Sequence, residues 1–124
     1  MAEWRRLCQG AHGVSLEGDD RVLVAVGERH QRIDILETPE TFELKSVVVR
    51  QSTVASLPDL ALRAWRRNRA MQLVGFRIDQ KGRLIGEAWV PRVGLTRDEF
   101  LITLQRLAAE CDLFEFHLTG KDRE

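Results

Sequence analysis

The sequence contains no tyrosine, only two cysteines and three histidines, and its 19 basic and 19 acidic side chains give a formal net charge of zero. The lack of tyrosine excludes a tyrosine general acid and tyrosine stacking on a ligand. The balanced charge argues against a protein that coats DNA or an anionic membrane. No apolar run approaches the roughly 20 residues that a membrane span needs, and the first residues lack the apolar stretch of a signal peptide. We therefore expect a cytoplasmic protein without a membrane partner.

The few cysteines and histidines indicate neither a disulfide framework nor a metal site. Cys8 and Cys111 are far apart and form no C-x-x-C pair, which fits a reducing compartment. Each occupies an apolar position of a predicted helix, where a free cysteine acts as a small hydrophobic residue. Cys8 and His12 would share a helical face, but this is half of a zinc site, and no second pair completes it. His30 and His117 add no known ligand spacing, so we predict no metal and no cofactor.

The residues that are present describe an ordinary globular protein. A length of 124 residues with 44% hydrophobic side chains suits one domain, which we expect to span residues 1–124. The charge is unevenly distributed, because residues 1–62 contain 7 basic and 10 acidic groups, whereas residues 63–124 contain 12 and 9. The basic excess is concentrated in one short segment, at Arg63, Arg66, Arg67 and Arg69. Such asymmetry favours self-association or an acidic partner.

Hydrophobic periodicity predicts three helices. Apolar residues at helical spacing predict the first helix over residues 2–11. The second begins near Ser56, where Ser56-Leu57-Pro58-Asp59 has the pattern of a capped helix start, and its apolar stripe runs to Trp65. The last begins at the capping box Thr96-Arg97-Asp98-Glu99 and ends at Gly120. Phe114, Phe116 and Leu118 also alternate as in a strand, but the helical period continues through them, and we favour the helix.

Alternation and turn residues predict the strands. Three strands cover residues 21–26, 30–36 and 41–50, with Val14 to Leu16 as a candidate short strand before them. The continuous apolar run from Val22 to Val26 indicates a strand covered on both faces or at least a central one. A hairpin covers residues 71–79 and 83–90. The order is helix–three strands–helix–two strands–helix, which predicts an α+β fold with one antiparallel sheet covered by helices.

No catalytic motif accompanies these elements. The sequence has no phosphate-binding loop, no G-x-G-x-x-G and no G-x-S-x-G. The adjacent pairs Asp19-Asp20 and Asp98-Glu99 suit a turn and a first helical turn. An enzyme or ligand-binding domain whose site includes Cys8, His12 or His117 stays an alternative. A second alternative is weak nucleic-acid binding through the Arg63–Arg69 segment, although Trp65 on its apolar stripe favours a solvated or partner-facing helix.

The sequence resembles the bacterial YbjN family, which shares the fold of class I type III secretion chaperones. The similarity covers most of the chain and is carried by Arg29-His30-Gln31-Arg32-Ile33, Ser46 and Val48, Ala61-Leu62-Arg63 with Asn68, Val74 to Asp79, Gly82-Arg83-Leu84, Val90-Pro91, Leu95 with Asp98-Glu99-Phe100, Leu107 to Asp112, Glu115, and Leu118 to Asp122. The chain departs from the family where Cys111 replaces the usual alanine and where Phe114-Glu115-Phe116 is unusually aromatic.

This resemblance implies a non-enzymatic protein-binding module, chaperone-like or a regulatory adaptor, that forms a homodimer through its middle helix. Its partners would be a protein client or a regulatory protein, with nucleic acid not expected. Secretion chaperones are typically acidic, whereas this chain is neutral. The residues that we expect at the protein interface lie on the middle helix and the first arm of the hairpin: Leu60, Arg63, Ala64, Trp65, Val74 and Phe76.

Overall fold

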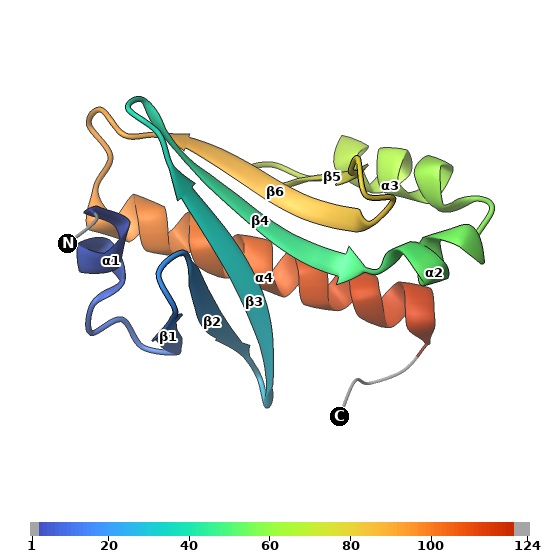
Figure 1. The fold of residues 1–124 in the computed structure, drawn as a ribbon, viewed down its shortest axis with the longest axis horizontal. Coiled ribbons are helices and arrows are strands. Elements are labelled where there is room, and N and C mark those ends of the chain that lie inside the picture. Colours follow the sequence, from blue (N-terminus) through green and yellow to red (C-terminus); the bar gives the residue numbers. More distant parts are fainter. Residues whose placement is uncertain (1–2, 121–124) are drawn as a thin grey trace.

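The computed structural model describes residues 3–120. The first residue of the predicted 2–11 helix and the end of the resemblance after Gly120 lie outside the described residues. The elements follow in the order α1 (Glu3–Cys8), β1 (Val14–Glu17), β2 (Arg21–Val26), β3 (Arg29–Glu37), β4 (Thr41–Val49), α2 (Gln51–Ala55), α3 (Leu60–Arg69), β5 (Gly75–Ile78), β6 (Leu84–Pro91) and α4 (Arg97–Thr119) (Figure 1). The predicted α+β fold is confirmed, the candidate short strand at Val14 to Leu16 is present as β1, and the short helix α2 is added to the predicted order.

The six strands form one antiparallel sheet in the order β1-β2-β3-β4-β6-β5. The first four strands form a meander because their connections are short. After α2 and α3 the chain returns so that β6 pairs with β4, and β5 becomes an edge strand. The sheet therefore joins an N-terminal meander to a C-terminal hairpin through the β4–β6 pair.

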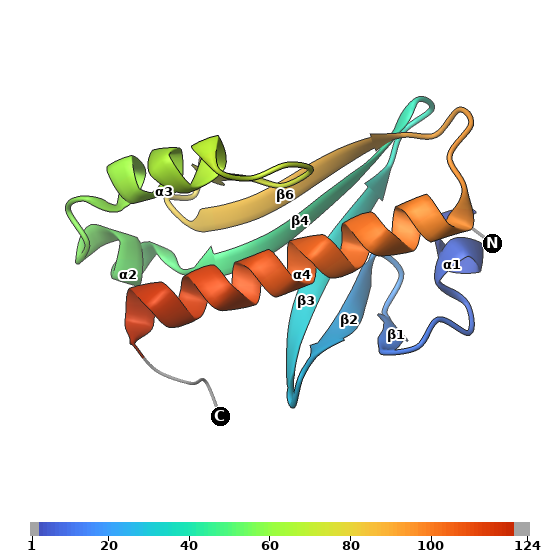
Figure 2. The ribbon, with the colours of Figure 1, turned by 180° about the vertical axis from the view of Figure 1, so that it is seen from behind.

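Helix α4 runs diagonally across one face of this sheet, and α1 lies beside its first turns (Figures 1 and 2). Alternate strand residues point to α4 and are buried, including Val24, Ile33 and Leu44. Phe42 of β4 meets Phe100 of α4 edge to face, with ring centroids 5.3 Å apart. The core lies between the sheet and α4, because this is where both apolar faces meet.

Both ends of α4 agree with the sequence prediction. The Thr96 hydroxyl accepts a hydrogen bond from the Glu99 amide at 3.1 Å, and the Glu99 carboxylate accepts one from the Thr96 amide at 2.9 Å. Gly120 ends the helix with a positive φ of 65°, which glycine adopts at low cost. The strand alternative for Phe114 to Leu118 is wrong, because these residues continue the helix and Phe114 is buried within it.

Two predictions for the N-terminal half need correction. Helix α1 ends at Cys8 instead of residue 11, because Gly10 leaves the helical conformation with a φ of 73°. Strand β2 is not covered on both faces: Val22 and Val24 are buried, but Ala25 on the opposite face is exposed. It is second from the edge, where its apolar run serves one core face only.

The start of the middle helix also differs from the prediction. Helix α3 begins at Leu60 after Asp59, and the Asp59 side chain makes no capping hydrogen bond. Ser56 instead ends α2, and its hydroxyl donates a 2.8 Å hydrogen bond to the carbonyl of Thr53. Pro58 therefore precedes the helix. The Ser56-to-Asp59 pattern therefore covers the short connection between two helices, from the end of α2 to the residue before α3.

The hairpin is confirmed, with a shorter first arm than predicted. Strand β5 covers only four residues, and α3 packs beside it at the edge of the sheet. The Asn68 side chain accepts a 2.7 Å hydrogen bond from the Phe76 amide and donates a 2.9 Å bond to the Phe76 carbonyl. These bonds pair backbone groups that a sheet edge would leave to solvent. Asn68 thus fixes the position of α3 against β5.

Candidate protein-binding surface

The predicted interface residues divide between the core and the surface. Four of them are buried within the chain, namely Leu60, Ala64, Val74 and Phe76. Arg63 is half-buried, and Trp65 has 57% of its surface exposed. The buried four hold α3 against β5 and the end of α4, as shown by the 4.7 Å contact between the rings of Phe76 and Phe114. Trp65 and Arg63 are the two that reach solvent.

Trp65 forms an apolar surface with its neighbours on α3 and β5. Ala61, Trp65 and Ile78, which we call the Trp65 patch, line a shallow hollow of about 260 Å³ with parts of Asn68 and Phe76. Ile78 is 39% exposed. The guanidinium of Arg69 lies 5.0 Å from the centre of the Trp65 ring, and this contact orients the indole. The result is a fixed aromatic side chain on an open surface, a feature common in protein interfaces.

A second apolar surface lies on the sheet face opposite α4. Leu36 and Trp89 are 57% and 61% exposed, and the strand register aligns both with Glu43 across β3, β4 and β6. Val47 lies further along β4 on the same face. Leu36 was missed at the sequence level, although the alternation of its strand places it with the polar residues Arg32 and Asp34. An apolar residue on a wet strand face is the signal that identifies it.

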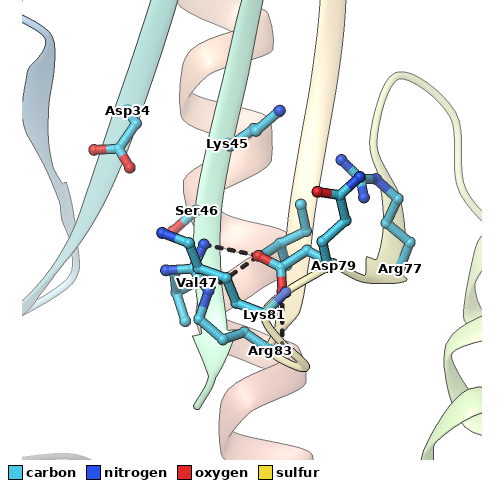
Figure 3. Close-up of a pocket in the computed structure, with 10 residues that line it drawn as sticks. Asp34, Lys45, Ser46, Val47, Arg77, Asp79, Lys81 and Arg83 are labelled. Carbon is cyan, nitrogen blue, oxygen red and sulfur yellow. Dashed lines mark hydrogen bonds and ion pairs between the residues drawn. The ribbon is translucent and has the colours of Figure 1, made fainter. Parts of the chain in front are cut away.

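The same sheet face carries a charged cavity of about 340 Å³ beneath the β5–β6 turn (Figure 3). Arg83 donates to Asp79 through Nε at 3.0 Å and through Nη2 at 2.7 Å, and the Lys81 amide donates to the same carboxylate at 3.0 Å. Desolvation opposes ionisation of Asp79, but the bonds and charge of Arg83 prevail and lower the pKa of the carboxyl. The Asp79 carboxylate is thus held by Arg83 and by the backbone of the turn, and it fixes the β5–β6 turn at the rim of this cavity.

Three of the four arginines of the basic segment line one cleft between α3 and α4, and Arg69 turns away to Trp65. Arg67 lies over the Phe114 ring at 4.6 Å and reaches Glu110 at 3.7 Å. Arg69 stacks on Trp65, and Arg63 reaches the His117 carbonyl at 3.5 Å. The three that lie together share their cleft with Glu110, and Arg69 lies apart, so the four do not form a continuous basic stripe along α3. The arrangement therefore disfavours the nucleic-acid alternative, which needs several cations following one backbone.

The cysteines have the properties of core residues. Burial raises the pKa of the Cys8 thiol to about 11 and that of Cys111 to about 12. Both thiols are therefore protonated near neutral pH and are poor nucleophiles. His12 lies beyond the end of α1 and does not share a helical face with Cys8. Between residues 3 and 120, no group of three His, Cys, Asp or Glu side chains is placed to hold a metal ion.

The adjacent carboxylates occupy the structural positions that the sequence indicated. Asp19 and Asp20 lie in the turn between β1 and β2, where both are exposed. Asp98 and Glu99 lie in the first turn of α4, and Glu99 completes the capping box. Hydrogen bonds from Thr96 lower the pKa of the Glu99 carboxyl. These four acidic groups serve turn and helix-start chemistry.

Two separate pieces of the family resemblance meet in a polar cluster. Arg29 at the start of β3 donates to Asp112 of α4 at 2.9 Å, and this hydrogen bond, against the cost of burial, lowers the pKa of the Asp112 carboxyl. Gln31 of β3 donates to Glu115 of α4 at 3.3 Å and accepts a 3.2 Å bond from the buried Ser46 hydroxyl. The motif residues thus fasten α4 across the sheet. Their role is structural.

Comparison with known proteins places the chain by its fold. No protein-family model and no curated protein matches the sequence. A solved structure, the crystal structure of the ExsC–ExsE complex, is similar with a TM-score of 0.61 over 94% of this chain and 93% of the matched chain, at 19% identity. The similarity establishes the secretion-chaperone-like α+β fold expected from the resemblance. In the described part of the chain, no helix has the length and hydropathy to cross a membrane.

Proposed function

We propose that this chain is a non-enzymatic, chaperone-like protein-binding module that acts in the cytoplasm as a homodimer. The observation that carries the proposal is the similarity of nearly the whole chain to a component of a two-protein complex. The protonated thiols and the structural use of the carboxylate pairs give no support to a catalytic alternative. The relationship to the YbjN family and a regulatory adaptor role belong to the same proposal.

The Trp65 patch supplies the dimer contact in this proposal. A large, exposed and oriented aromatic residue is the kind of side chain that contributes most to protein association. The four buried interface residues, Leu60, Ala64, Val74 and Phe76, support the patch from beneath by holding α3 on β5. Arg69, which lies over the Trp65 ring, gives the contact a polar rim, whereas Arg63 of the same helix reaches His117 of α4.

The dimer is tested by exchanging one exposed tryptophan at a time. Trp65→Glu places a charge in the proposed contact, whereas Trp89→Glu makes the same change at a site of similar exposure on the sheet face. By light scattering after size-exclusion chromatography, we expect twice the chain mass of 14.2 kDa for the wild type and for Trp89→Glu. Trp65→Glu should elute as a single chain, because an unpaired charge at an interface centre is strongly unfavourable.

A wild-type protein that remains a single chain at high concentration would contradict the dimer. If both glutamate variants remain dimeric, the contact lies elsewhere. Protein binding is tested separately by installing a photo-crosslinking amino acid at Leu36, Val47 or Trp89, outside the proposed dimer contact, in cells of the source organism. Crosslinks from this sheet face to a second, different protein are expected, and their absence at all three positions would contradict the binding role.

A further inference from the structure

The cleft between α3 and the last turns of α4 collects more cationic groups than the protein itself neutralises. It encloses about 580 Å³, and we call it the arginine cleft. Its polar lining comprises Arg63, Arg66, Arg67, Glu110 and His117. Three guanidinium groups thus face one carboxylate. Like charges held this close repel one another, so an additional anion in the cleft would be favourable.

The arginine side chains retain unused hydrogen-bond donors. Arg67 is held in place by the Phe114 ring at 4.6 Å, and its Nη1 lies 3.3 Å from Nδ1 of His117. Its Nε is buried and has no hydrogen-bond partner. Within residues 3–120, the exposed Arg66 forms no ion pair and no side-chain hydrogen bond. That Nε atom is closed to solvent, whereas the Arg66 guanidinium keeps its donors for an acceptor that enters the cleft.

The remaining lining is apolar, which limits the class of ligand that fits. Ala70, Met71 and Phe114 contribute carbon surface beside the cations. A carboxylate side chain matches this combination, because its oxygens accept planar guanidinium bonds while its methylene groups contact carbon. A nucleic-acid backbone would instead need several cations in a row. Arg69 does not extend the group of cations in the cleft, because its side chain stacks on Trp65.

We propose that the arginine cleft binds carboxylate side chains from an acidic segment of a protein partner. The inference rests on the proposed function only for the source of this segment, because the cleft itself is formed within one chain. It assigns a role to the basic excess of residues 63–124 that the apolar surfaces do not explain. Arg67 is held by Phe114 and His117, and Arg66 is the exposed cation that contacts the ligand.

The proposal is tested with the full chain and a hexaglutamate peptide. We expect the peptide to shift the guanidinium nitrogen signals of Arg66 and Arg67 in NMR spectra, with an affinity that falls as salt is added. Arg66→Gln should weaken binding about tenfold, because it removes a charge-assisted hydrogen bond. Arg6→Gln removes the same charge from an exposed site on α1, outside the cleft and outside the Trp65 patch, and it should change the affinity less than about twofold.

Several results would overturn the proposal. Hexaglutamate could leave the arginine signals unmoved, or Arg6→Gln could weaken binding as much as Arg66→Gln, which would indicate diffuse attraction. Stronger displacement of the same signals by oligothymidylate or by inorganic phosphate would assign the cleft to a different ligand. The two proposals fail separately: a monomer that binds hexaglutamate contradicts the dimer alone, whereas a dimer that ignores the peptide contradicts the cleft alone.

Discussion

Gly86 lies in β6 and faces Cys111 and Leu107 of α4. A methyl group at this position would collide with the Cys111 sulfur and would lie 2.9 Å from a ring carbon of Phe76. Cys111 stands where the YbjN family, which the sequence resembles, usually has alanine. The larger cysteine side chain therefore packs against glycine, the smallest residue, at position 86. Glycine is required here by close packing, since its backbone does not adopt a positive φ.

Replacing Gly86 with alanine should therefore lower the free energy of unfolding by about 2 kcal/mol, the usual cost of overfilling a packed core. Gly75→Ala is the matched control, because it lies on the adjacent strand β5 and its added methyl group would meet no atom within 4 Å. Urea unfolding followed by tryptophan fluorescence measures both variants. Equal stability of the two variants would contradict close packing at Gly86.

At the scale of elements, α4 was predictable because independent signals agree on it. The capping box, the uninterrupted apolar period and the terminal glycine all indicate the same helix. The start of α3 was not predictable from its local pattern. The same Ser56-to-Asp59 pattern suits a helix start, but α2 ends at Ser56 because Gln51–Ala55 is itself helical. A capping pattern indicates that a helix boundary is near, but it does not show whether a helix ends or begins there.

The hydroxyl groups of Thr96 and Ser56 can be compared directly, because Thr96 caps the start of α4 whereas Ser56 lies at the end of α2. Thr96→Ala should destabilise the protein by about 1 kcal/mol, because the amide of Glu99 loses its acceptor. Ser56→Ala removes an exposed hydroxyl and should cost less than about 0.5 kcal/mol. Thermal unfolding monitored by circular dichroism measures both. A larger loss for Ser56→Ala would restore Ser56 as a helix cap.

At the scale of the whole molecule, an ion pair joins residues that are 83 positions apart in the chain. Arg29 begins β3, and Asp112 lies in the second half of α4. The pair therefore joins the sheet directly to the helix. The Asp112 side chain is 8% exposed. Its hydrogen bond from Arg29 lowers the pKa of the carboxyl in the folded protein. The pair therefore contributes stability above the pKa of an unfolded aspartate, about 4, and loses it as the pH falls through the lowered folded value.

Asp112→Asn should lower the free energy of unfolding by about 2 kcal/mol at neutral pH, because Arg29 loses its charged acceptor. The same variant should lose less stability than the wild type when the pH is lowered below about 4. Asp34→Asn is the control, since the Arg21–Asp34 pair is exposed and should contribute less than about 1 kcal/mol. Urea titrations across the acid range measure these differences, and parallel pH curves for all three proteins would contradict the assignment.

The exposed residues of the candidate protein-binding surface were predictable only in part, because their exposure depends on how whole elements pack. Helical spacing correctly placed Leu60, Ala64 and Trp65 on one stripe, but it could not show how wide the contact with β5 is. Because β5 is short and lies at the edge, α3 buries the first two residues and leaves Trp65 in solvent. The arginine cleft depends on α3 and α4 meeting, and no local pattern in either helix indicates that meeting.

The side-chain amide of Asn68 has a consequence for how copies of this sheet can associate. By pairing both backbone groups of Phe76, it caps the β5 edge against another strand. A second copy that approaches beside α3 is therefore denied strand pairing with Phe76. The proposed association through the Trp65 patch then rests on side-chain contacts, and it cannot extend the sheet from one molecule to the next at this edge.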